Sequence, residues 1–207
     1  MSVPSVVVFD LGKVLVDFDY GIAAAKIARR SKATVEQVRH ALDQSPLLTQ
    51  FETGSMTNEQ FAAEVCAACG YSGTMDEFYA AFADIFREIK PMVAVQAALK
   101  ANGIPTCVFS NTNGLAVGHL RRHFPFFSGF DNHVFSYEQG CMKPDERIYA
   151  IVERATGYAG GAIVYLDDRA ENVQGGLARG WRTILHETPE KTIAALRQMG
   201  LPVNVNS

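Results

Sequence analysis

Residues 6–19 read VVVFDLGKVLVDFD, an apolar run that ends in an aspartate. The bulky residues Val6 to Phe9 predict a buried strand, and Asp10 places a carboxylate at its carboxyl end. Ligands of open α/β sheets bind at this end of the strands. Asp10 is therefore the first candidate functional residue, and Gly12 follows it two positions later.

After about residue 90 the sequence alternates short β-rich runs with helical patterns. Besides residues 5–10, the predicted strands are IPTCVFS (104–110), HVFSY (133–137), AIVYLDD (162–168) and RTILH (182–186). Predicted helices begin at Pro91 and Pro144, cover residues 114–123 and 170–179, and follow Thr188 and Pro189. Strands that alternate with helices imply a parallel sheet, so we expect an α/β fold.

Residues 20–90 differ, because they show helical patterns and no convincing strand. Three threonines precede Gln or Glu with the spacing of a helix capping box: Thr34 with Gln37, Thr57 with Gln60, and Thr74 with Glu77. Gly70 stands where a helix would stop. We therefore expect residues 17–90 to form an inserted helical cap, hinged near residues 17–21 and 90–91, on a core domain of residues 1–16 and 91–207.

The composition, with 48% hydrophobic and 20% charged residues in 207, predicts an ordinary water-soluble globular protein. A net charge of −3 without a basic stripe argues against nucleic acid as a partner. The sequence shows no signal peptide or membrane span, so we expect a cytoplasmic protein with no membrane partner. The four cysteines fit a reducing compartment, and Cys66 and Cys69 are expected to be buried thiols, not a redox or metal pair.

Polar residues follow the later strands as Asp10 follows the first. They are Ser110 and Asn111 after the second strand, Lys143 before Pro144, and Asp167 with Asp168 after AIVYL. One such residue alone would be weak evidence, since Ser, Asn and Asp are common helix N-caps. Together, and in this order, they indicate a functional site at the carboxyl ends of the strands.

This set resembles the haloacid dehalogenase superfamily, whose members carry an Asp nucleophile, a Ser or Thr, a Lys and an acidic pair in this order. The strings FDLGKVLVDFD, FSNTN, GCMKPDERIY and YLDDRAENV look most similar to its α-D-glucose-1-phosphate phosphatase-like branch. The resemblance implies a Rossmann-like three-layer α/β/α core with a C1-type helical cap. It also implies a Mg²⁺-dependent phosphatase acting on a small phosphorylated metabolite, such as glucose 1-phosphate, through an aspartyl phosphate.

The resemblance gives each candidate residue a catalytic or substrate-binding role. Asp10 would attack phosphorus as the nucleophile. Lys143 would tie this nucleophile to the phosphate. The Ser110 hydroxyl and the Asn111 amide would bind the phosphate oxygens.

The same resemblance implies a metal site. Mg²⁺, or Mn²⁺ in its place, would be held by Asp10, the Gly12 backbone carbonyl and Asp168, with Asp167 binding directly or through water. Asn172 would steady the acidic pair. These ligands are hard oxygen atoms, as Mg²⁺ requires.

Gly12 occupies the place where most phosphatases of this superfamily carry a second aspartate, which protonates the leaving oxygen. General acid help of this kind is worth about 10²–10⁴-fold in rate. An acidic leaving group, such as the anomeric oxygen of a sugar 1-phosphate, would tolerate the loss best. Asp17 is the nearest substitute acid in sequence, although a structural role in the loop is simpler. Phe51 and Glu52 either face the substrate or lie in an exposed loop.

Three alternatives remain open at this point. A 2-haloacid dehalogenase would use the same nucleophile on carbon without a metal, so the pair of Asp167 and Asp168 counts against it. A catalytically weak phosphate-binding or partner-binding protein is disfavoured by the retained Asp10 and Lys143. A mutase would need an acid at position 12. The expected assembly is a monomer or a homodimer.

Overall fold

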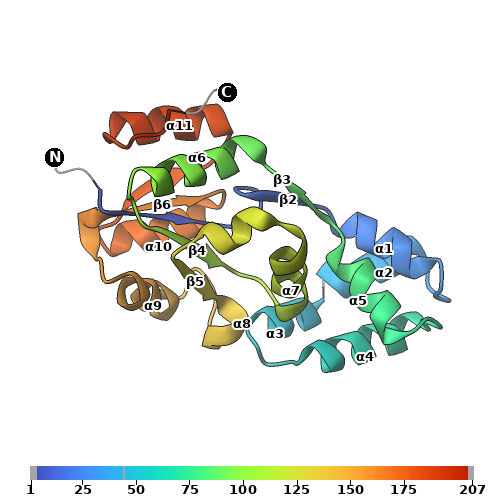
Figure 1. Cartoon of the computed structure of the whole chain (residues 1–207). Coiled ribbons are helices and arrows are strands. Elements are labelled where there is room, and N and C mark those ends of the chain that lie inside the picture. Colours follow the sequence, from blue (N-terminus) through green and yellow to red (C-terminus); the bar gives the residue numbers. More distant parts are fainter. Residues whose placement is uncertain (1–3, 44, 205–207) are drawn as a thin grey trace.

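Five parallel strands form the sheet of the larger lobe in this computed structural model, which describes residues 4–43 and 45–204 (Figure 1). The strands are β1 (Val6–Phe9), β4 (Thr106–Ser110), β5 (Asn132–Phe135), β6 (Ile163–Asp167) and β7 (Arg182–Leu185). Their order across the sheet is β5-β4-β1-β6-β7, which puts β1 between β4 and β6. The expected α/β fold with a parallel sheet is confirmed.

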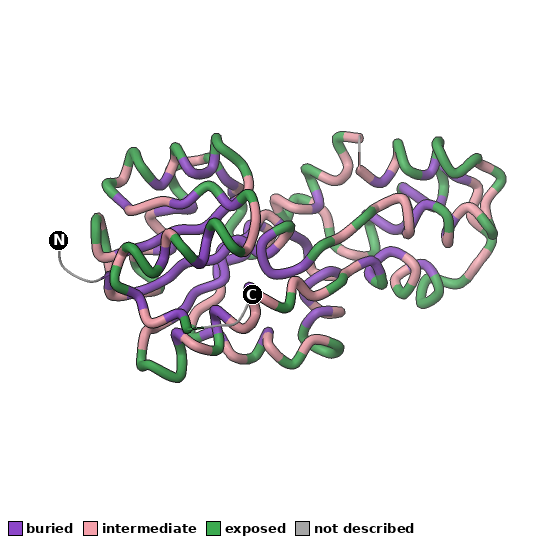
Figure 2. Tube along the Cα trace, turned by 90° about the horizontal axis from the view of Figure 1, so that it is seen from above, coloured by how far each residue is buried: buried purple, intermediate pink, exposed green. Residues whose placement is uncertain are grey.

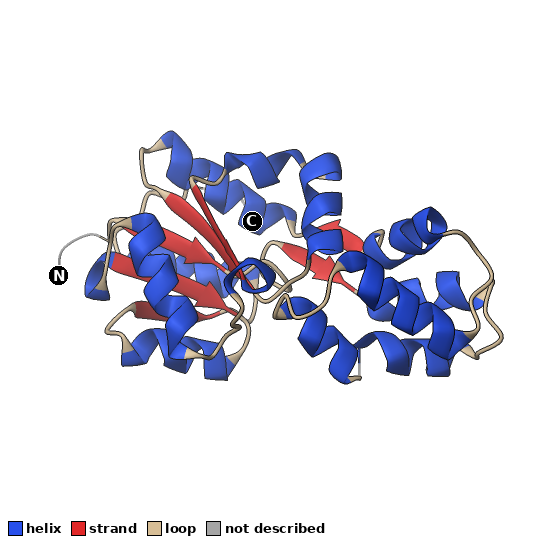
Figure 3. Cartoon of the chain, turned by 90° about the horizontal axis from the view of Figure 1, so that it is seen from below, coloured by secondary structure: helices blue, strands red, loops and turns tan. Residues whose placement is uncertain are grey.

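Helices cover both faces of this sheet and produce three layers (Figure 3). They are α6 (Lys90–Ala101), α7 (Gly114–His123), α8 (Ser136–Gln139), α9 (Glu146–Thr156), α10 (Ala170–Ala178) and α11 (Pro189–Gln198), with 3-10 turns at Pro125–Gly129 and Gly160–Ala162. Among the helices of residues 4–43 and 45–204, none has the length and apolar character needed to cross a membrane.

Two of these helices begin differently from the sequence-based prediction. α9 begins at Glu146 and not at Pro144, because the Asp145 side chain accepts a hydrogen bond from the Arg147 backbone N–H and caps the helix there. Ser136 was expected in a strand but begins α8. β-propensity in HVFSY therefore extended the predicted strand past its true end.

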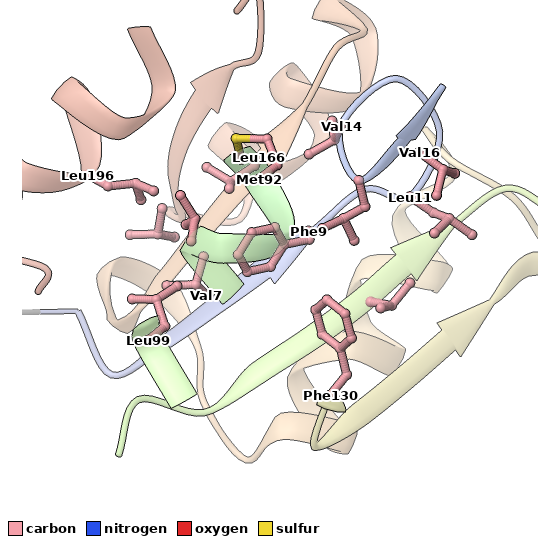
Figure 4. Close-up of a cluster of buried hydrophobic side chains, with 14 of the residues drawn as sticks. Val7, Phe9, Leu11, Val14, Val16, Met92, Leu99, Phe130, Leu166 and Leu196 are labelled. Carbon is pink, nitrogen blue, oxygen red and sulfur yellow. The ribbon is translucent and has the colours of Figure 1, made fainter. Parts of the chain in front are cut away.

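Side chains of β1 alternate between two buried apolar clusters, one on each face of the sheet. Val7 and Phe9 point into a cluster with Leu99 of α6 and Leu196 of α11 (Figure 4). Val6 and Val8 pack in the other, which includes residues of α9. Burial on both faces explains why the strand is a continuous apolar run and not an alternating one.

The smaller lobe consists mainly of helices (Figure 1). Its helices are α1 (Tyr20–Ala28), α2 (Val35–Asp43), α3 (Pro46–Glu52), α4 (Asn58–Cys69) and α5 (Met75–Ala83). The predicted capping boxes are present at the starts of α2, α4 and α5. Gly70 ends α4 in a left-handed conformation.

This lobe has an apolar cluster of its own, built around phenylalanine rings. Buried residues lie in the interior of both lobes (Figure 2). The rings of Phe51 and Phe61 stack with centroids 4.3 Å apart, and Phe82 contacts both. Cys66 and Cys69 are free and buried beside this cluster, as predicted, and burial raises the pKa of both thiols.

A short antiparallel hairpin joins the two lobes and corrects the expectation of a strand-free block. β2 (Val16–Phe18) pairs with β3 (Phe86–Glu88), so the chain enters and leaves the helical lobe side by side (Figure 3). Strands of three residues are too short to produce a recognisable period. Their partners also lie at opposite ends of the lobe in sequence, so local patterns could not reveal the pairing.

Phe82→Ala should lower the free energy of unfolding by about 3–5 kcal/mol, because it leaves a cavity among buried aromatic rings. Urea denaturation followed by circular dichroism measures this change. Leu177→Ala, at an exposed position of α10, is the matched control and should change stability little. A loss similar to that of the control would show that the phenylalanine cluster does not stabilise the helical lobe.

Candidate active site

The carboxyl ends of β1, β4 and β6 meet at the edge of the sheet that faces the helical lobe (Figure 3). Asp10 directly follows β1, Ser110 ends β4, and Asp167 ends β6. The parallel register aligns β1 with both neighbours, so the three polar residues leave the sheet side by side. The strands β4 and β6 lie on opposite sides of β1, and a ligand crevice usually forms where the strand order reverses in this way.

The buried ammonium group of Lys143 connects these strand ends. Its Nζ donates to Asp10 Oδ1 at 2.7 Å, to Asp167 Oδ2 at 2.7 Å, and to the Phe109 carbonyl at 2.9 Å. Burial alone would lower the pKa of Lys143, but the two carboxylates outweigh it and the pKa is raised. All three N–H donors therefore have protein partners, and the ammonium stays charged.

Burial raises the pKa of Asp10, and the charge of Asp167 adds to this shift while Lys143 opposes it. The pKa of Asp168 is also raised, by burial and by Asp167. Three carboxylates thus share the charge of one ammonium group. A further cation at this place would relieve the repulsion among them.

The acidic residues have the composition of a site for a hard divalent cation. One carboxylate oxygen from each of Asp10, Asp167 and Asp168 lies within 4.8 Å of the others. Mg²⁺ prefers oxygen ligands and usually takes only one or two of them from carboxylates. The residues present therefore fit Mg²⁺, and its two charges would balance the excess of carboxylates.

Asp167 and Asp168 have different surroundings. Asp167 Oδ1 accepts hydrogen bonds from the Arg169 backbone N–H and from Asn172 Nδ2, at 2.8 Å and 3.0 Å. Its Oδ2 accepts from Lys143 and from the Tyr165 hydroxyl. Asp168 is half-buried and lines the cavity. Both carboxylate oxygens of Asp167 thus accept hydrogen bonds from the protein, whereas Asp168 faces the cavity.

Of the partners of Asp167, Asn172 was predicted from the sequence and Tyr165 was not. Asn172 was predicted to steady the acidic pair, and its amide donates to both oxygens of Asp167. Tyr165 was missed. The available signal was its position two residues before Asp167 in β6, which places both side chains on one face of the strand.

Asn111 lines the cavity, and its side-chain amide also contacts the backbone of Lys143. Its Oδ1 accepts from the Lys143 backbone N–H at 2.7 Å, and its Nδ2 donates to the Lys143 carbonyl at 3.0 Å. These contacts fix the backbone that carries Lys143 and use one of the two N–H groups of the amide, so the phosphate contact expected from the sequence stays a prediction. Ser110 lines the cavity, and its hydroxyl donates to the Asn111 carbonyl at 3.3 Å.

The ring of Phe18 closely approaches Gly12. A Cβ at this position would lie 2.7 Å from Cε1 of the Phe18 ring, so a side chain here would require that ring to move. Phe18 is held in β2, with its ring 5.7 Å from that of Tyr20. The space that a second aspartate would need is therefore taken by an aromatic ring from the hairpin.

Asp17 was considered as a substitute acid, and the structure places it away from Asp10. It is exposed in β2, pairs with Lys13, and does not line the cavity that contains Asp10. Its hydrogen bond with Lys13 lowers its pKa, so it remains ionised at neutral pH. Both observations argue against a role for Asp17 as proton donor.

The site opens into a cavity of about 220 Å³ between the two lobes. Asp10, Ser110, Lys143 and Asp168 line it from the larger lobe, and Tyr20 and Glu52 line it from the smaller one. Glu52 ends α3 and is half-buried, so it does not lie in an exposed loop. A larger hollow of about 840 Å³ lies between α5 and α7, and none of the clustered carboxylates lines it.

Several solved structures have the same fold. A predicted HAD-like family hydrolase from Porphyromonas gingivalis matches with a TM-score of 0.79 and 23% identity, covering 95% of this chain and 99% of that one. A HAD family enzyme from Bacteroides thetaiotaomicron, in complex with magnesium and inorganic phosphate, matches with a TM-score of 0.76 and 18% identity over 87% and 93% of the chains. L-2-haloacid dehalogenase from Xanthobacter autotrophicus gives 0.65 and 16%, over 92% and 81%.

Sequence comparison adds the family. D-ribitol-5-phosphate phosphatase of Bacteroides thetaiotaomicron is 23% identical over 189 residues, which are 87% of this chain and 91% of that protein. Acyl-CoA dehydrogenase family member 10 of Mus musculus is 24% identical over 96% of this chain, although the match spans only 19% of the mouse protein. The family model for haloacid dehalogenase-like hydrolases matches residues 4–180. The chain therefore belongs to the haloacid dehalogenase-like hydrolases, the superfamily that its motifs resemble.

Proposed function

We propose that this hydrolase is a Mg²⁺-dependent phosphatase that acts on a small phosphorylated metabolite through an aspartyl phosphate on Asp10. The observation that carries the proposal is the buried hydrogen-bonded set of Asp10, Lys143 and Asp167, with Asp168 beside it at the cavity. The relative named as a phosphatase and the neighbour solved with magnesium and phosphate support the same chemistry.

The residues divide the reaction among them as follows. The carboxylate of Asp10, oriented through Oδ1 by Lys143, attacks phosphorus while the bond from phosphorus to the leaving oxygen breaks. Water then attacks the phosphorus, and the bond to Asp10 breaks to release phosphate. Lys143 stays charged throughout, because its pKa is raised, and balances the negative charge near the nucleophile. The Ser110 hydroxyl lines the cavity and is assigned to a phosphoryl oxygen.

The proposed Mg²⁺ ligands are Asp10, the Gly12 carbonyl and Asp168. Asp167 would position these ligands through its hydrogen bonds with Lys143 and Asn172. When bound, Mg²⁺ neutralises charge on the phosphoryl oxygens. Around the proposed metal position, three carboxyl groups outnumber the one ammonium group, that of Lys143, so negative charge is in excess. A divalent cation is therefore expected to bind there more tightly than a monovalent one.

The proposed substrate class is a sugar or polyol phosphate, such as glucose 1-phosphate or a relative of ribitol 5-phosphate. A cavity of about 220 Å³ favours a small substrate. We further propose that residues 17–90 act as the cap and residues 1–16 and 91–207 as the core. Tyr20 and Glu52 would then contact the part of the substrate that leaves.

A panel of sugar and polyol phosphates, assayed for phosphate release with and without Mg²⁺, tests this function. We expect release from small members of the panel, abolished by EDTA and restored by Mg²⁺. Halide release from 2-chloropropionate should be absent, because the acidic cluster serves a metal-dependent reaction. Halide release without phosphate release would instead support a haloacid dehalogenase.

Asp10→Asn should reduce phosphate release by at least about 10³-fold, since an amide cannot form the acyl phosphate. The variant keeps the shape of the side chain but removes an ionic partner of Lys143, so its circular dichroism spectrum at the assay temperature is the control for folding. Substantial metal-dependent turnover by a folded Asp10→Asn protein would contradict the assignment of the nucleophile.

Asp168→Asn and Asp167→Asn should fail in different ways. Asp168→Asn should raise the Mg²⁺ concentration for half-maximal activity at least about tenfold without loss of stability. Asp167→Asn should lower the free energy of unfolding by about 3 kcal/mol, because buried Lys143 loses an ionic partner. Magnesium titration and urea denaturation of both variants measure these effects. Equal effects of the two substitutions would mean that their roles are not distinct.

A further inference from the structure

The proposed reaction needs a proton for the leaving oxygen, and the larger lobe does not supply an obvious donor. Gly12 carries no side chain, and Phe18 fills the space beside it. Asp17 is exposed and paired with Lys13. Lys143 has a raised pKa and uses its three N–H groups for protein partners. Asp168 also lines the cavity, but it is assigned to the metal, so we looked for a proton donor on the other wall of the cavity.

Glu52 is the acidic residue that the helical lobe places in this cavity. It lines the 220 Å³ cavity together with Asp10, Gly12 and Ser110. It also lines an adjoining pocket of about 40 Å³ with Gly12 and Ser110. Glu52 therefore shares both hollows with Gly12, the position of the missing second aspartate, and approaches them from the helical lobe.

The residues around Glu52 fix its position from both lobes. Phe51 is buried in the phenylalanine cluster and stacks on Phe61, which anchors the end of α3. Two residues after Glu52, Gly54 has a φ of +72°, and a Cβ there would lie 2.2 Å from the backbone oxygen of Tyr137. The turn after Glu52 thus rests directly against α8 of the larger lobe.

Charged and polar groups from several elements surround the carboxyl group of Glu52. Burial raises its pKa to about 7, Asp10 adds to the shift, and Arg169 opposes it. Tyr20 lines the same cavity, and Glu52 contributes to the raised pKa of its hydroxyl. A raised pKa favours the protonated form of the carboxyl group, which is the form that a general acid needs.

We propose that Glu52, supplied by the helical lobe, is the general acid of this hydrolase and replaces the aspartate that Gly12 lacks. The inference rests on the proposed phosphatase function. As Asp10 forms its bond to phosphorus and the bond to the leaving oxygen breaks, the Glu52 carboxyl gives its proton to that oxygen and becomes a carboxylate. It then takes a proton from the water that attacks the phosphoryl group, which returns both carboxyl groups to their starting states.

The test compares leaving groups in wild type and Glu52→Gln. We measure kcat/KM for p-nitrophenyl phosphate, phenyl phosphate, glycerol 3-phosphate and ribitol 5-phosphate, because this ratio reports the first chemical half of the reaction. Glu52→Gln should lower it about 10²-fold or more for the alkyl esters, whose leaving oxygens need a proton. For p-nitrophenyl phosphate the loss should be only a few-fold, since its leaving group departs as a stable anion.

Two further readouts separate proton donation from substrate binding. The wild-type kcat/KM for alkyl esters should fall above a pH of about 7, and this limb should disappear in Glu52→Gln. Glu59→Gln, at an exposed position of α4, is the matched control and should behave as wild type. Asp17→Asn should also leave the selectivity between aryl and alkyl esters unchanged.

Several outcomes would overturn the inference. An equal loss for all four esters in Glu52→Gln would make Glu52 a binding residue and leave the phosphatase proposal intact. Selective loss for alkyl esters in Asp17→Asn would assign the proton to Asp17. A wild-type protein that hydrolyses only the aryl esters would show no proton donation. A wild-type protein that releases no phosphate from any ester would reject the phosphatase function itself.

Discussion

The buried ammonium group of Lys143 is the constraint on which the site depends. It binds the carboxylates that follow β1 and β6 and the backbone carbonyl of Phe109 in β4, so one charge fixes three neighbouring strand ends. An unpaired ion at this depth would cost several kcal/mol, so the loss of one partner would destabilise the whole set of charges. Asn111 holds the backbone of Lys143 with two hydrogen bonds, and Asn172 holds Asp167. The polar site is thus as tightly specified as the apolar core beneath it.

The part of this site that lies at strand ends could be predicted from sequence. Asp10, Ser110 and Asp167 each follow a short apolar run, and a parallel sheet brings the ends of such runs together without any knowledge of side-chain contacts. Lys143 was singled out with them by its place before Pro144, but its role came from the family resemblance, because nothing in its local sequence shows that its side chain reaches Asp10. The helical lobe was equally accessible, since capping boxes mark where α4 and α5 begin.

The parts that escaped prediction depend on contacts between distant segments. The pairing of β2 with β3 joins the two ends of the helical lobe, and the same pairing holds Phe18 against Gly12. In the sequence, Gly12 shows only that an aspartate is missing. The structure adds that the Phe18 ring packs closely against this position. Asn111 shows a related limit, because its residue type suggested phosphate binding but did not reveal that its amide also holds the backbone of Lys143. Residue type limits what a side chain can do, and its neighbours decide among those options.

An acid on the helical lobe makes proton donation depend on the contact between the two lobes. An aspartate at position 12 would stand beside the nucleophile whether or not the cavity were closed. Glu52 lines the same cavity as Asp10, and the turn at Gly54 that follows it rests against the larger lobe. With Glu52 as the proposed acid, proton donation and exclusion of water depend on the same contact between the two lobes. The Phe18 ring occupies the space beside Gly12. The proposed acid therefore comes from the helical lobe and not from the core.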